Sequence, residues 1–181
     1  QGDTVVEISC GTGLNFSLLQ KAVGPKGRII GVDLTEGMLR QAQRRVEVNG
    51  WNNVELIQSD AARFEFPREV DGILSTFAIT LIPEFDQIIQ NGVSALKPNG
   101  RWVILDFKLP EGPLGFLAPL AAFIMKPFGV SMDLANRHPW ERLQSHMGDF
   151  QMEHVFGGFA YIAAAGKISL PATNLKSERI E

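Results

Sequence analysis

Two glycines near the amino terminus, Gly11 and Gly13, have the spacing of a ligand-binding turn. They follow an apolar run at residues 4–9 and lie just before a helical pattern at residues 15–22. Glycines in such a turn adopt conformations closed to other residues, and N–H groups near a helix start can bind a nucleotide or a carboxylate. A dinucleotide fingerprint needs a third glycine, but Phe16 stands at that position. The turn therefore predicts a nucleotide or carboxylate site without the pyrophosphate fingerprint.

Three acidic residues lie where they could complete this site. Asp33 ends the second apolar run about 20 residues after the turn, a spacing from which a carboxylate reaches both hydroxyls of a ribose. Asp60 ends the third run, from which it could accept a hydrogen bond from the exocyclic amine of adenine. Glu7 lies inside the first run, where an unpaired charge is costly, so we expect it to bond to backbone donors or a ligand ammonium. Asp33 and Asp60 could instead cap helices, a common role of aspartate.

The elements that must position these residues alternate along the chain. Continuous apolar runs predict strands buried on both faces, and the amphipathic runs between them predict helices that cover a parallel sheet. Thr35 is the expected N-cap of the second helix and Gly50 its left-handed stop. The connection at residues 60–70 is short for a crossover helix. We expect strands at residues 4–9, 28–33, 54–58, 72–76 and 101–106, helices at residues 15–22, 35–49 and 84–96, and a turn at residues 97–100.

The pattern changes after this fifth strand. Residues 107–137 form an insert rich in Pro, Gly, Phe and Leu, and residues 139–147 are predicted to be helical. Two further apolar runs, at residues 151–156 and 159–165, are separated only by Gly157 and Gly158, which is the signal of a β-hairpin. The fold class we predict is α/β: a doubly wound, Rossmann-like, mixed seven-stranded sheet with an antiparallel last strand.

The composition is that of a soluble globular protein. Of the 181 residues, 45% are hydrophobic and 20% are charged, which excludes disordered, collagenous and disulfide-stapled classes. The net charge of −3 does not favour nucleic-acid binding. This length suits one domain, which we place at residues 1–166, followed by a C-terminal tail at residues 167–181.

Cysteine and histidine give no sign of a metal site. Cys10 is the only cysteine, which is compatible with a reducing compartment, so we expect a cytoplasmic protein in which Cys10 is a packing residue. His138, His146 and His154 lack the spacing of metal ligands, and no metal is predicted.

The insert carries an apolar segment at residues 112–125, too short to span a membrane. This segment could belong to the core, form a dimer surface, line an acceptor pocket or rest on a bilayer as a peripheral contact. Its large apolar side chains are Leu114, Phe116, Leu117, Leu120, Phe123, Ile124 and Met125.

Four segments in order, residues 7–13, 31–33, 59–61 and 96–104, together resemble the class I S-adenosylmethionine-dependent methyltransferases. This resemblance implies S-adenosyl-L-methionine as cofactor, S-adenosyl-L-homocysteine as product, and no metal. It implies that Asp33 binds the ribose and that Leu34 and Met38 flank the adenine. The other implied cofactor-binding residues are Glu7, Ser9, Cys10, Gly11, Thr12 and Gly13 around the methionine part, Asp60 and Ala61 at the adenine edge, and Thr76 and Phe77 near the sulfonium.

Two departures from the family pattern stand out. Ser9 replaces the usual glycine of the turn, and little of the chain precedes Thr4, where family members tend to carry helices that close over the cofactor. A missing lid would weaken both binding and catalysis.

Within this family, residues 10–16, 103–107 and 157–161 resemble the branch of quinone-ring C-methyltransferases and bacterial phospholipid N-methyltransferases. The resemblance implies a small or lipophilic acceptor, with a quinone ring or a phospholipid amine favoured, and peripheral contact with a membrane. Residues 76–79 are unlike the Asn-Pro-Pro-Tyr signature of base or glutamine methylation. His138 and Tyr161 are the residues to test as acceptor-side catalytic groups.

Two other functions stay open at this point. A non-catalytic member of the family would bind the cofactor without turnover, and Ser9 and the short segment before Thr4 are compatible with it. An NAD-dependent oxidoreductase on a similar sheet is less favoured, because Phe16 replaces the third glycine and because of the acid at Asp60. The sequence leaves open the acceptor, the methylated atom (N, C or O), the general base and the oligomeric state.

Overall fold

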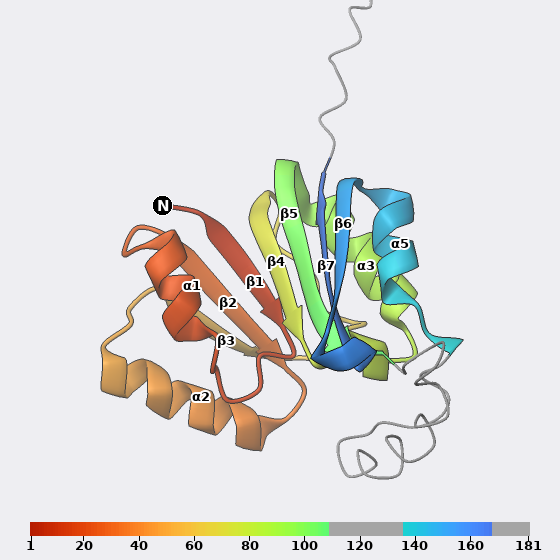
Figure 1. Ribbon diagram of the computed structural model, residues 1–181. Coiled ribbons are helices and arrows are strands. Elements are labelled where there is room, and N and C mark those ends of the chain that lie inside the picture. Colours follow the sequence, from red (N-terminus) through yellow and green to blue (C-terminus); the bar gives the residue numbers. More distant parts are fainter. Residues whose placement is uncertain (109–135, 168–181) are drawn as a thin grey trace, which may run out of the picture.

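The computed structural model describes residues 1–108 and 136–167 (Figure 1). The predicted apolar segment at residues 112–125, most of the insert and the tail from residue 168 lie outside the described residues. None of the helices in the described part of the chain has the length and apolar character needed to cross a membrane.

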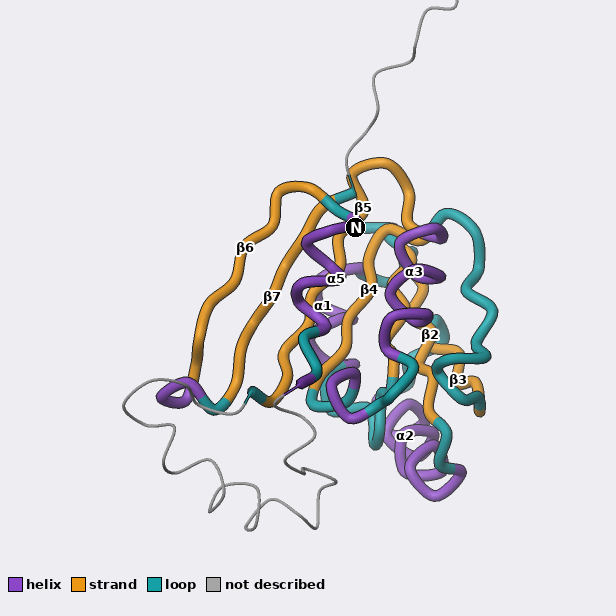
Figure 2. The backbone as a smooth tube through the Cα atoms, turned by 90° about the vertical axis from the view of Figure 1, so that its right-hand side faces the viewer, coloured by secondary structure: helices purple, strands orange, loops and turns teal. Residues whose placement is uncertain are grey.

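Seven strands form one sheet in the order β3-β2-β1-β4-β5-β7-β6. Neighbouring strands among the first five are parallel, whereas β7 is antiparallel to both β5 and β6. Figure 2 shows β6 and β7 toward one edge of the sheet and β2 and β3 toward the opposite edge. The predicted fold class and its antiparallel last strand are therefore confirmed. The strands are β1 (Thr4–Ile8), β2 (Arg28–Asp33), β3 (Val54–Gln58), β4 (Val70–Thr76), β5 (Leu96–Phe107), β6 (Gly148–Val155) and β7 (Ala160–Gly166).

Helices cover both faces of this sheet. On one face α1 (Phe16–Val23) and α2 (Glu36–Asn49) pack against β1, β2 and β3, and on the other α3 (Phe85–Ala95) and α5 (Pro139–His146) pack against β5, β6 and β7. Two short 3₁₀ helices, η1 (Ile79–Leu81) and η5 (Phe156–Gly158), lie in connections. Gly50 ends α2 in the left-handed conformation, as predicted. The predicted cap Thr35 does precede α2, but its side chain makes no capping hydrogen bond.

Three strands, β4, β5 and β6, begin two or more residues earlier than predicted, and the other boundaries agree to within a residue or two. The strand β4 begins at Val70, two residues early, and β6 begins at Gly148, three residues early. The predicted turn at residues 97–100 is part of β5, because Leu96 already pairs with Val70 and the extra residues are absorbed in a register shift. Asn99 takes a positive φ of 67° within this irregularity, a conformation that asparagine tolerates better than most residues.

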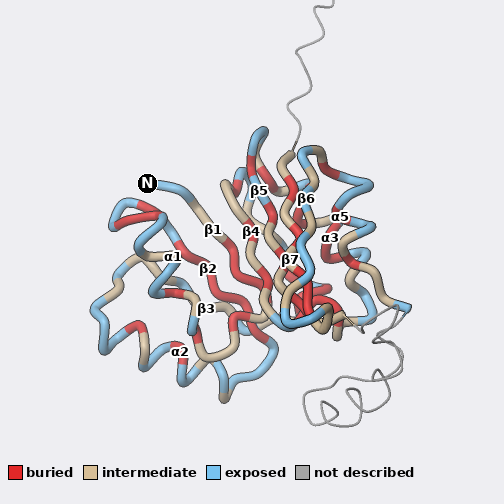
Figure 3. The backbone as a smooth tube through the Cα atoms, in the orientation of Figure 1, coloured by how far each residue is buried: buried red, intermediate tan, exposed pale blue. Residues whose placement is uncertain are grey.

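No helix joins β3 to β4, as the short connection suggested. Instead, this segment covers the sheet with single side chains: Ala61, Ala62 and Phe64 are buried in the same cluster as Val6 and Ile8 of β1. Figure 3 shows buried positions running along the central strands, while the outer sides of α1 and α2 are exposed. The sheet therefore obtains part of its cover from a loop rather than from a crossover helix.

Phe16 fixes the contact between α1 and the sheet. Its side chain is fully buried, and its ring lies so close to Gly31 of β2 that a Cβ on Gly31 would sit 2.7 Å from Phe16 Cζ. In dinucleotide-binding folds a third glycine allows a helix to approach the strand at this point. Here the ring of Phe16 fills that space, and the glycine that permits the close approach is Gly31, on the strand instead of the helix.

We expect the substitution Gly31→Ala to destabilise the protein by about 1–3 kcal/mol, because the new methyl group would overpack the space held by Phe16 and Cys10. Gly37→Ala is the matched control: its Cβ would meet nothing closer than 3.7 Å, and in α2 alanine gains up to about 1 kcal/mol over glycine. Urea unfolding of both variants measures the difference. Equal stability of the two variants would contradict the packing assigned to Phe16.

Candidate functional site at the carboxyl edge of the sheet

The glycine turn lies at the carboxyl ends of the parallel strands. Ile8 pairs with Val32 and with Ser75, and Asp33 pairs with Gln58, so the segments that follow β1, β2, β3 and β4 meet at one edge. This is the edge at which doubly wound sheets bind their ligands. The sequence-predicted residues that follow these strands are thereby brought to one edge, although they are spread over 70 positions of the chain from Glu7 to Phe77.

The turn itself contains three residues with positive φ: Ser9 at 54°, Gly11 at 55° and Gly13 at 71°. A Cβ on Gly11 would project into open space, whereas one on Gly13 would collide with the ring of Phe16. Gly13 is therefore required for packing, and Gly11 leaves its backbone open to a ligand. The conformation of Ser9 is one that glycine adopts without strain, which explains physically why glycine is usual at this position in the family that the sequence resembles.

Glu7 is buried beneath this turn. Its Oε1 accepts a hydrogen bond of 2.6 Å from Nδ2 of Asn15, and its Oε2 has no partner. Burial raises the pKa of this carboxyl to about 7, against the lowering effect of the Asn15 bond. We expected backbone donors or a ligand at Glu7, and the donor present is instead a side-chain amide. One buried carboxylate oxygen is left ready to accept from a ligand.

Asp33 ties the turn to the end of β2. Its Oδ2 accepts from the backbone N–H of Gly11 at 2.9 Å, and its Oδ1 accepts from that of Thr35 at 2.8 Å. The bond to the glycine turn was not predicted: the two roles weighed from the sequence were ribose binding and capping of the following helix. Each oxygen keeps a second lone pair that a hydroxyl group could use.

Asp60 and the side chains around it form the outer part of the edge. Oδ1 of Asp60 accepts from the N–H of Ala62 at 2.9 Å, so this carboxylate caps the turn that follows β3. Leu34 and Met38 lie exposed after β2, with 65% and 42% of their surfaces accessible. Large apolar side chains left open beside carboxylates offer a surface on which a flat ring can rest.

The end of β4 is held by two polar groups. Thr76 Oγ1 accepts from Asn15 at 3.0 Å, and the buried Asp106 of β5 accepts from the N–H groups of Ala78 and Thr80. Between them Phe77 takes a φ of 53° and leaves 40% of its surface exposed. Strain of this kind persists only where the surroundings impose it, and it is frequent at ligand sites.

Tyr161 of β7 lies opposite Asp106, near the carboxyl end of β5. The side chain is fully buried, and its hydroxyl forms a hydrogen bond of 3.2 Å with Thr80 Oγ1. Burial and then the Asp106 carboxylate raise its pKa, so the phenol stays protonated. The structure places the Tyr161 hydroxyl in the packed interior beside Thr80, and its role as an acceptor-side group stays a prediction.

His138 precedes α5. Its ring stacks on Trp140 at 4.8 Å between ring centroids, and its Nδ1 lies 3.1 Å from Glu141 Oε1. Trp140 in turn packs edge-on against Tyr161. His138 therefore belongs to an aromatic cluster on the side of the sheet that carries α5.

Cys10 is buried, and its pKa is raised by burial and then by the nearby Glu7 and Asp33 carboxylates. A protonated, buried thiol is a packing residue and not a nucleophile. Among the residues that the structure describes, no cluster of His, Cys, Asp and Glu could hold a metal ion.

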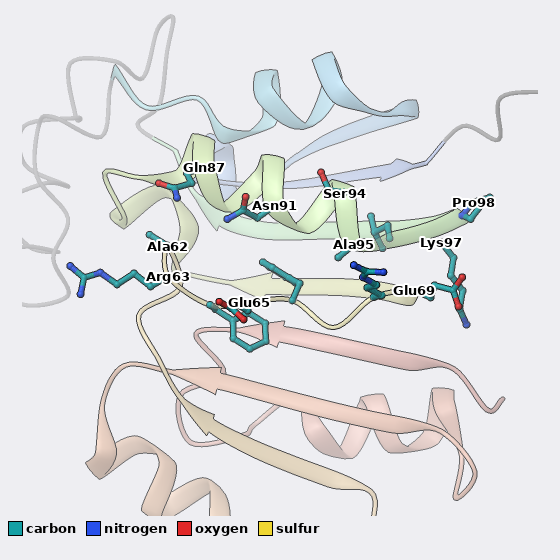
Figure 4. Close-up of a pocket in the computed structure, with 14 residues that line it drawn as sticks. Ala62, Arg63, Glu65, Glu69, Gln87, Asn91, Ser94, Ala95, Lys97 and Pro98 are labelled. Carbon is teal, nitrogen blue, oxygen red and sulfur yellow. The ribbon is translucent and has the colours of Figure 1, made fainter.

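A separate groove of about 780 Å³ lies between the β3–β4 connection and α3 (Figure 4). Arg63 and Glu65 line one side, and Gln87 and Asn91 of α3 line the other. None of the sequence-predicted site residues lines it. The groove follows from the missing crossover helix and lies apart from the glycine turn.

Sequence reasoning missed two residues of the site, Asn15 and Asp106. Asn15 stood at the expected start of a helix, where asparagine is an ordinary cap, and Asp106 stood at the end of a strand. Two acids at strand ends, Asp33 and Asp60, had already been taken as signals, so Asp106 at the end of β5 carried the same signal. Nothing in the sequence indicated that Asn15 reaches Glu7.

Together, fold and site define a Rossmann-like domain with carboxylates gathered around a glycine turn at the carboxyl edge of its sheet. The chain belongs to the methyltransferase domain family, whose sequence profile matches residues 5–100. The family resemblance seen in the sequence is therefore confirmed.

Individual relatives agree with this family. A demethylmenaquinone methyltransferase of Listeria welshimeri is 29% identical over 114 residues, which is 62% of this chain and 48% of the relative. The chain thus spans about half the length of the curated relatives it matches.

Two solved structures share the fold. A SAM dependent methyltransferase from Aquifex aeolicus is 21% identical, with a TM-score of 0.64 over 93% of this chain and 84% of its own. Phosphoethanolamine N-methyltransferase 2 of Haemonchus contortus, solved with phosphomonomethylethanolamine and S-adenosylhomocysteine, is 18% identical, with a TM-score of 0.76 over 93% of this chain and 49% of its own.

The raised pKa of Glu7 predicts how stability depends on pH. Because the folded state holds this proton more tightly than the unfolded state, the stabilising contribution is present below pH 4.5 and is lost as the pH rises through about 7. The loss amounts to about 3 kcal/mol. Glu7→Gln removes this titrating group. The free energy of unfolding of the variant should therefore rise relative to that of the wild type as the pH is raised from 4 to 8.

Urea unfolding at several pH values measures this gain. The contributions of the other titrating groups cancel when the variant is compared with the wild type at each pH. Glu153→Gln, which removes an exposed carboxylate of β6, is the matched control and should follow the wild-type profile. Parallel profiles for wild type and Glu7→Gln would show that Glu7 does not titrate as described.

Proposed function

We propose that this chain binds S-adenosyl-L-methionine at the carboxyl edge and transfers its methyl group to a small or lipophilic acceptor. The observation that carries the proposal is the unpartnered Oε2 of Glu7, buried under a glycine turn that is tied to Asp33. A buried acceptor without a donor is costly in a folded protein unless a ligand supplies the donor. An amino acid joined to a nucleoside supplies an ammonium and ribose hydroxyls together.

The residues present fit this cofactor. Glu7 would accept from its ammonium group, and the backbone at Gly11 would lie along its methionine part, in the space that a Cβ there would enter. Asp33 would accept from the ribose hydroxyls through its remaining lone pairs. The remaining assignments are Leu34 and Met38 against the adenine, Asp60 and Ala61 at its edge, Ser9, Cys10, Thr12 and Gly13 shaping the turn, and Thr76 and Phe77 near the sulfonium.

When bound, this cofactor supplies an electrophilic methyl group on a sulfonium sulfur. The chain must then hold an acceptor atom about 3–3.5 Å from the methyl carbon and exclude water, a contribution of up to about 7–11 kcal/mol. Phe77 and Phe107, whose rings are 4.8 Å apart, offer an apolar wall for this purpose at the end of β4 and β5. An amine acceptor attacks without prior loss of a proton, whereas a carbon or hydroxyl acceptor needs a base.

The relatives and this apolar wall support the proposed acceptor class. The relatives named above act on demethylmenaquinone and on phosphoethanolamine, according to their names, and both support a quinone ring or a phospholipid amine here. Peripheral membrane contact would bring such acceptors to the edge. His138 remains a candidate acceptor-side group, since its imidazole lies 37% exposed at the start of α5.

The test has two stages. Calorimetry with S-adenosyl-L-homocysteine and with NADH decides the cofactor, and tight binding of NADH alone would overturn the proposal. Radiolabelled methyl transfer to quinone, phospholipid and small-amine acceptors then decides the activity. Binding without any labelled product across these acceptors would favour the non-catalytic alternative.

A surface variant tests where the adenine binds. Leu34→Ala should leave stability within about 0.5 kcal/mol, because the side chain is mostly exposed, but should weaken S-adenosyl-L-homocysteine about fivefold through the lost apolar contact. Val48→Ala is the matched control, since Val48 is 86% exposed near the other end of α2. Calorimetry measures the dissociation constant of S-adenosyl-L-homocysteine for each variant. Equal values for the two variants would show that Leu34 does not contact the bound adenine.

A further inference from the structure

Asn15 occupies the N-cap position of α1 but does not cap this helix. An asparagine at that position usually accepts a hydrogen bond from an N–H of the first turn through its side chain. Here no such bond is made, and the backbone has helical φ and ψ of −80° and −14°. The carbonyl of Asn15 already accepts from Leu18 and Leu19, so the helix begins without help from the side chain. The amide group is therefore available for another role.

Both donor contacts of this amide point toward the site. Nδ2 of Asn15 donates to Glu7 Oε1 at 2.6 Å and to Thr76 Oγ1 at 3.0 Å. It thereby links the end of β1 to the end of β4, the strand that leads to Phe77. In this orientation the amide nitrogen faces Glu7, and the bond it donates favours the ionised form of the carboxyl.

This bond determines which oxygen of Glu7 is free. Because Oε1 is held by Asn15, the second oxygen, Oε2, is the one left without a partner. The influences that shift the pKa of Glu7 are burial and the Asn15 bond, and neither is a positive charge. Asp33 and Cys10, which interact electrostatically with this cluster, carry no positive charge either, and Arg45 of α2 donates to the Thr12 carbonyl of the turn and not to Glu7. The free oxygen of Glu7 therefore lacks a positively charged partner.

We propose that Asn15 is a positioning residue that holds Glu7 with Oε2 directed to a ligand ammonium, and thereby selects nucleosides that carry an amino-acid tail. This inference rests on the proposed function and adds a specificity to it. A nucleoside with the same adenine, ribose and thioether but without the amino acid gains nothing from the bond between Asn15 and Glu7. Asn15 should therefore discriminate between two ligands that share every other contact.

The experiment compares S-adenosyl-L-homocysteine with 5′-methylthioadenosine by calorimetry. In Asn15→Ala, and in Asn15→Leu, which keeps the volume without the donor, affinity for S-adenosyl-L-homocysteine should fall about tenfold. Affinity for 5′-methylthioadenosine should stay within about twofold. The matched control is Gln20→Ala on the same helix, whose amide bonds to Asn53 and not to the site, and which should leave both affinities unchanged.

A second readout is the pH profile of binding. The Asn15 bond favours the ionised form of Glu7, so its removal should move the rise in S-adenosyl-L-homocysteine affinity to higher pH. The 5′-methylthioadenosine profile should not move. A merely structural role for Asn15 would weaken both ligands alike and leave both profiles in place.

The outcomes separate this inference from the proposed function. If the wild type binds neither ligand, the cofactor assignment itself fails. If the wild type binds both and the Asn15 variants lose them in equal proportion, the cofactor assignment stands and the role of Asn15 is overturned. Thermal melts of both variants establish that folded protein is compared.

Discussion

The structure depends on placing carboxylates at the buried ends of strands without leaving them unpaired. A charge in this position costs several kcal/mol unless donors surround it. Asp33 meets this requirement with the N–H groups of Gly11 and Thr35, and in doing so it sets the distance between the glycine turn and α2. The turn exists in its present shape because a carboxylate on the neighbouring strand accepts from it.

A carboxylate that accepts from backbone N–H groups also occurs in the second half of the sheet. Asp106 accepts from Ala78, Thr80 and Phe107 N–H groups and so fixes the segment that follows β4. Burial raises its pKa, against the effect of these bonds. Glu7 differs from both aspartates, since one of its oxygens has no donor. Two carboxylates thus hold the backbone of the edge in place, and the third keeps one oxygen without a hydrogen-bond donor.

Much of this arrangement could be predicted from the sequence, because continuous apolar runs and glycine turns are local signals. The order of elements, the hairpin of β6 and β7 and the clustering of Glu7, Asp33 and Asp60 at one edge all follow from such patterns. The bond from Asn15 to Glu7 and the burial of Tyr161 could not be predicted, since both depend on how distant segments pack. The beginning of β5 was missed because a Pro-Asn-Gly sequence that usually forms a turn was absorbed as an irregularity in a paired strand.

Six residues other than glycine hold a positive φ in the described part of the chain: Ser9, Glu69, Phe77, Asn99, Asp149 and Phe156. Each such residue costs on the order of 1 kcal/mol that glycine would not incur. Ser9 and Phe77 belong to the carboxyl edge, whereas Glu69, Asn99, Asp149 and Phe156 lie in connections or in the irregular parts of β5 and β6. For protein engineering this divides the six positions into two groups: glycine at the second group offers thermal tolerance away from the proposed site, whereas glycine at the first group would alter the backbone of that site.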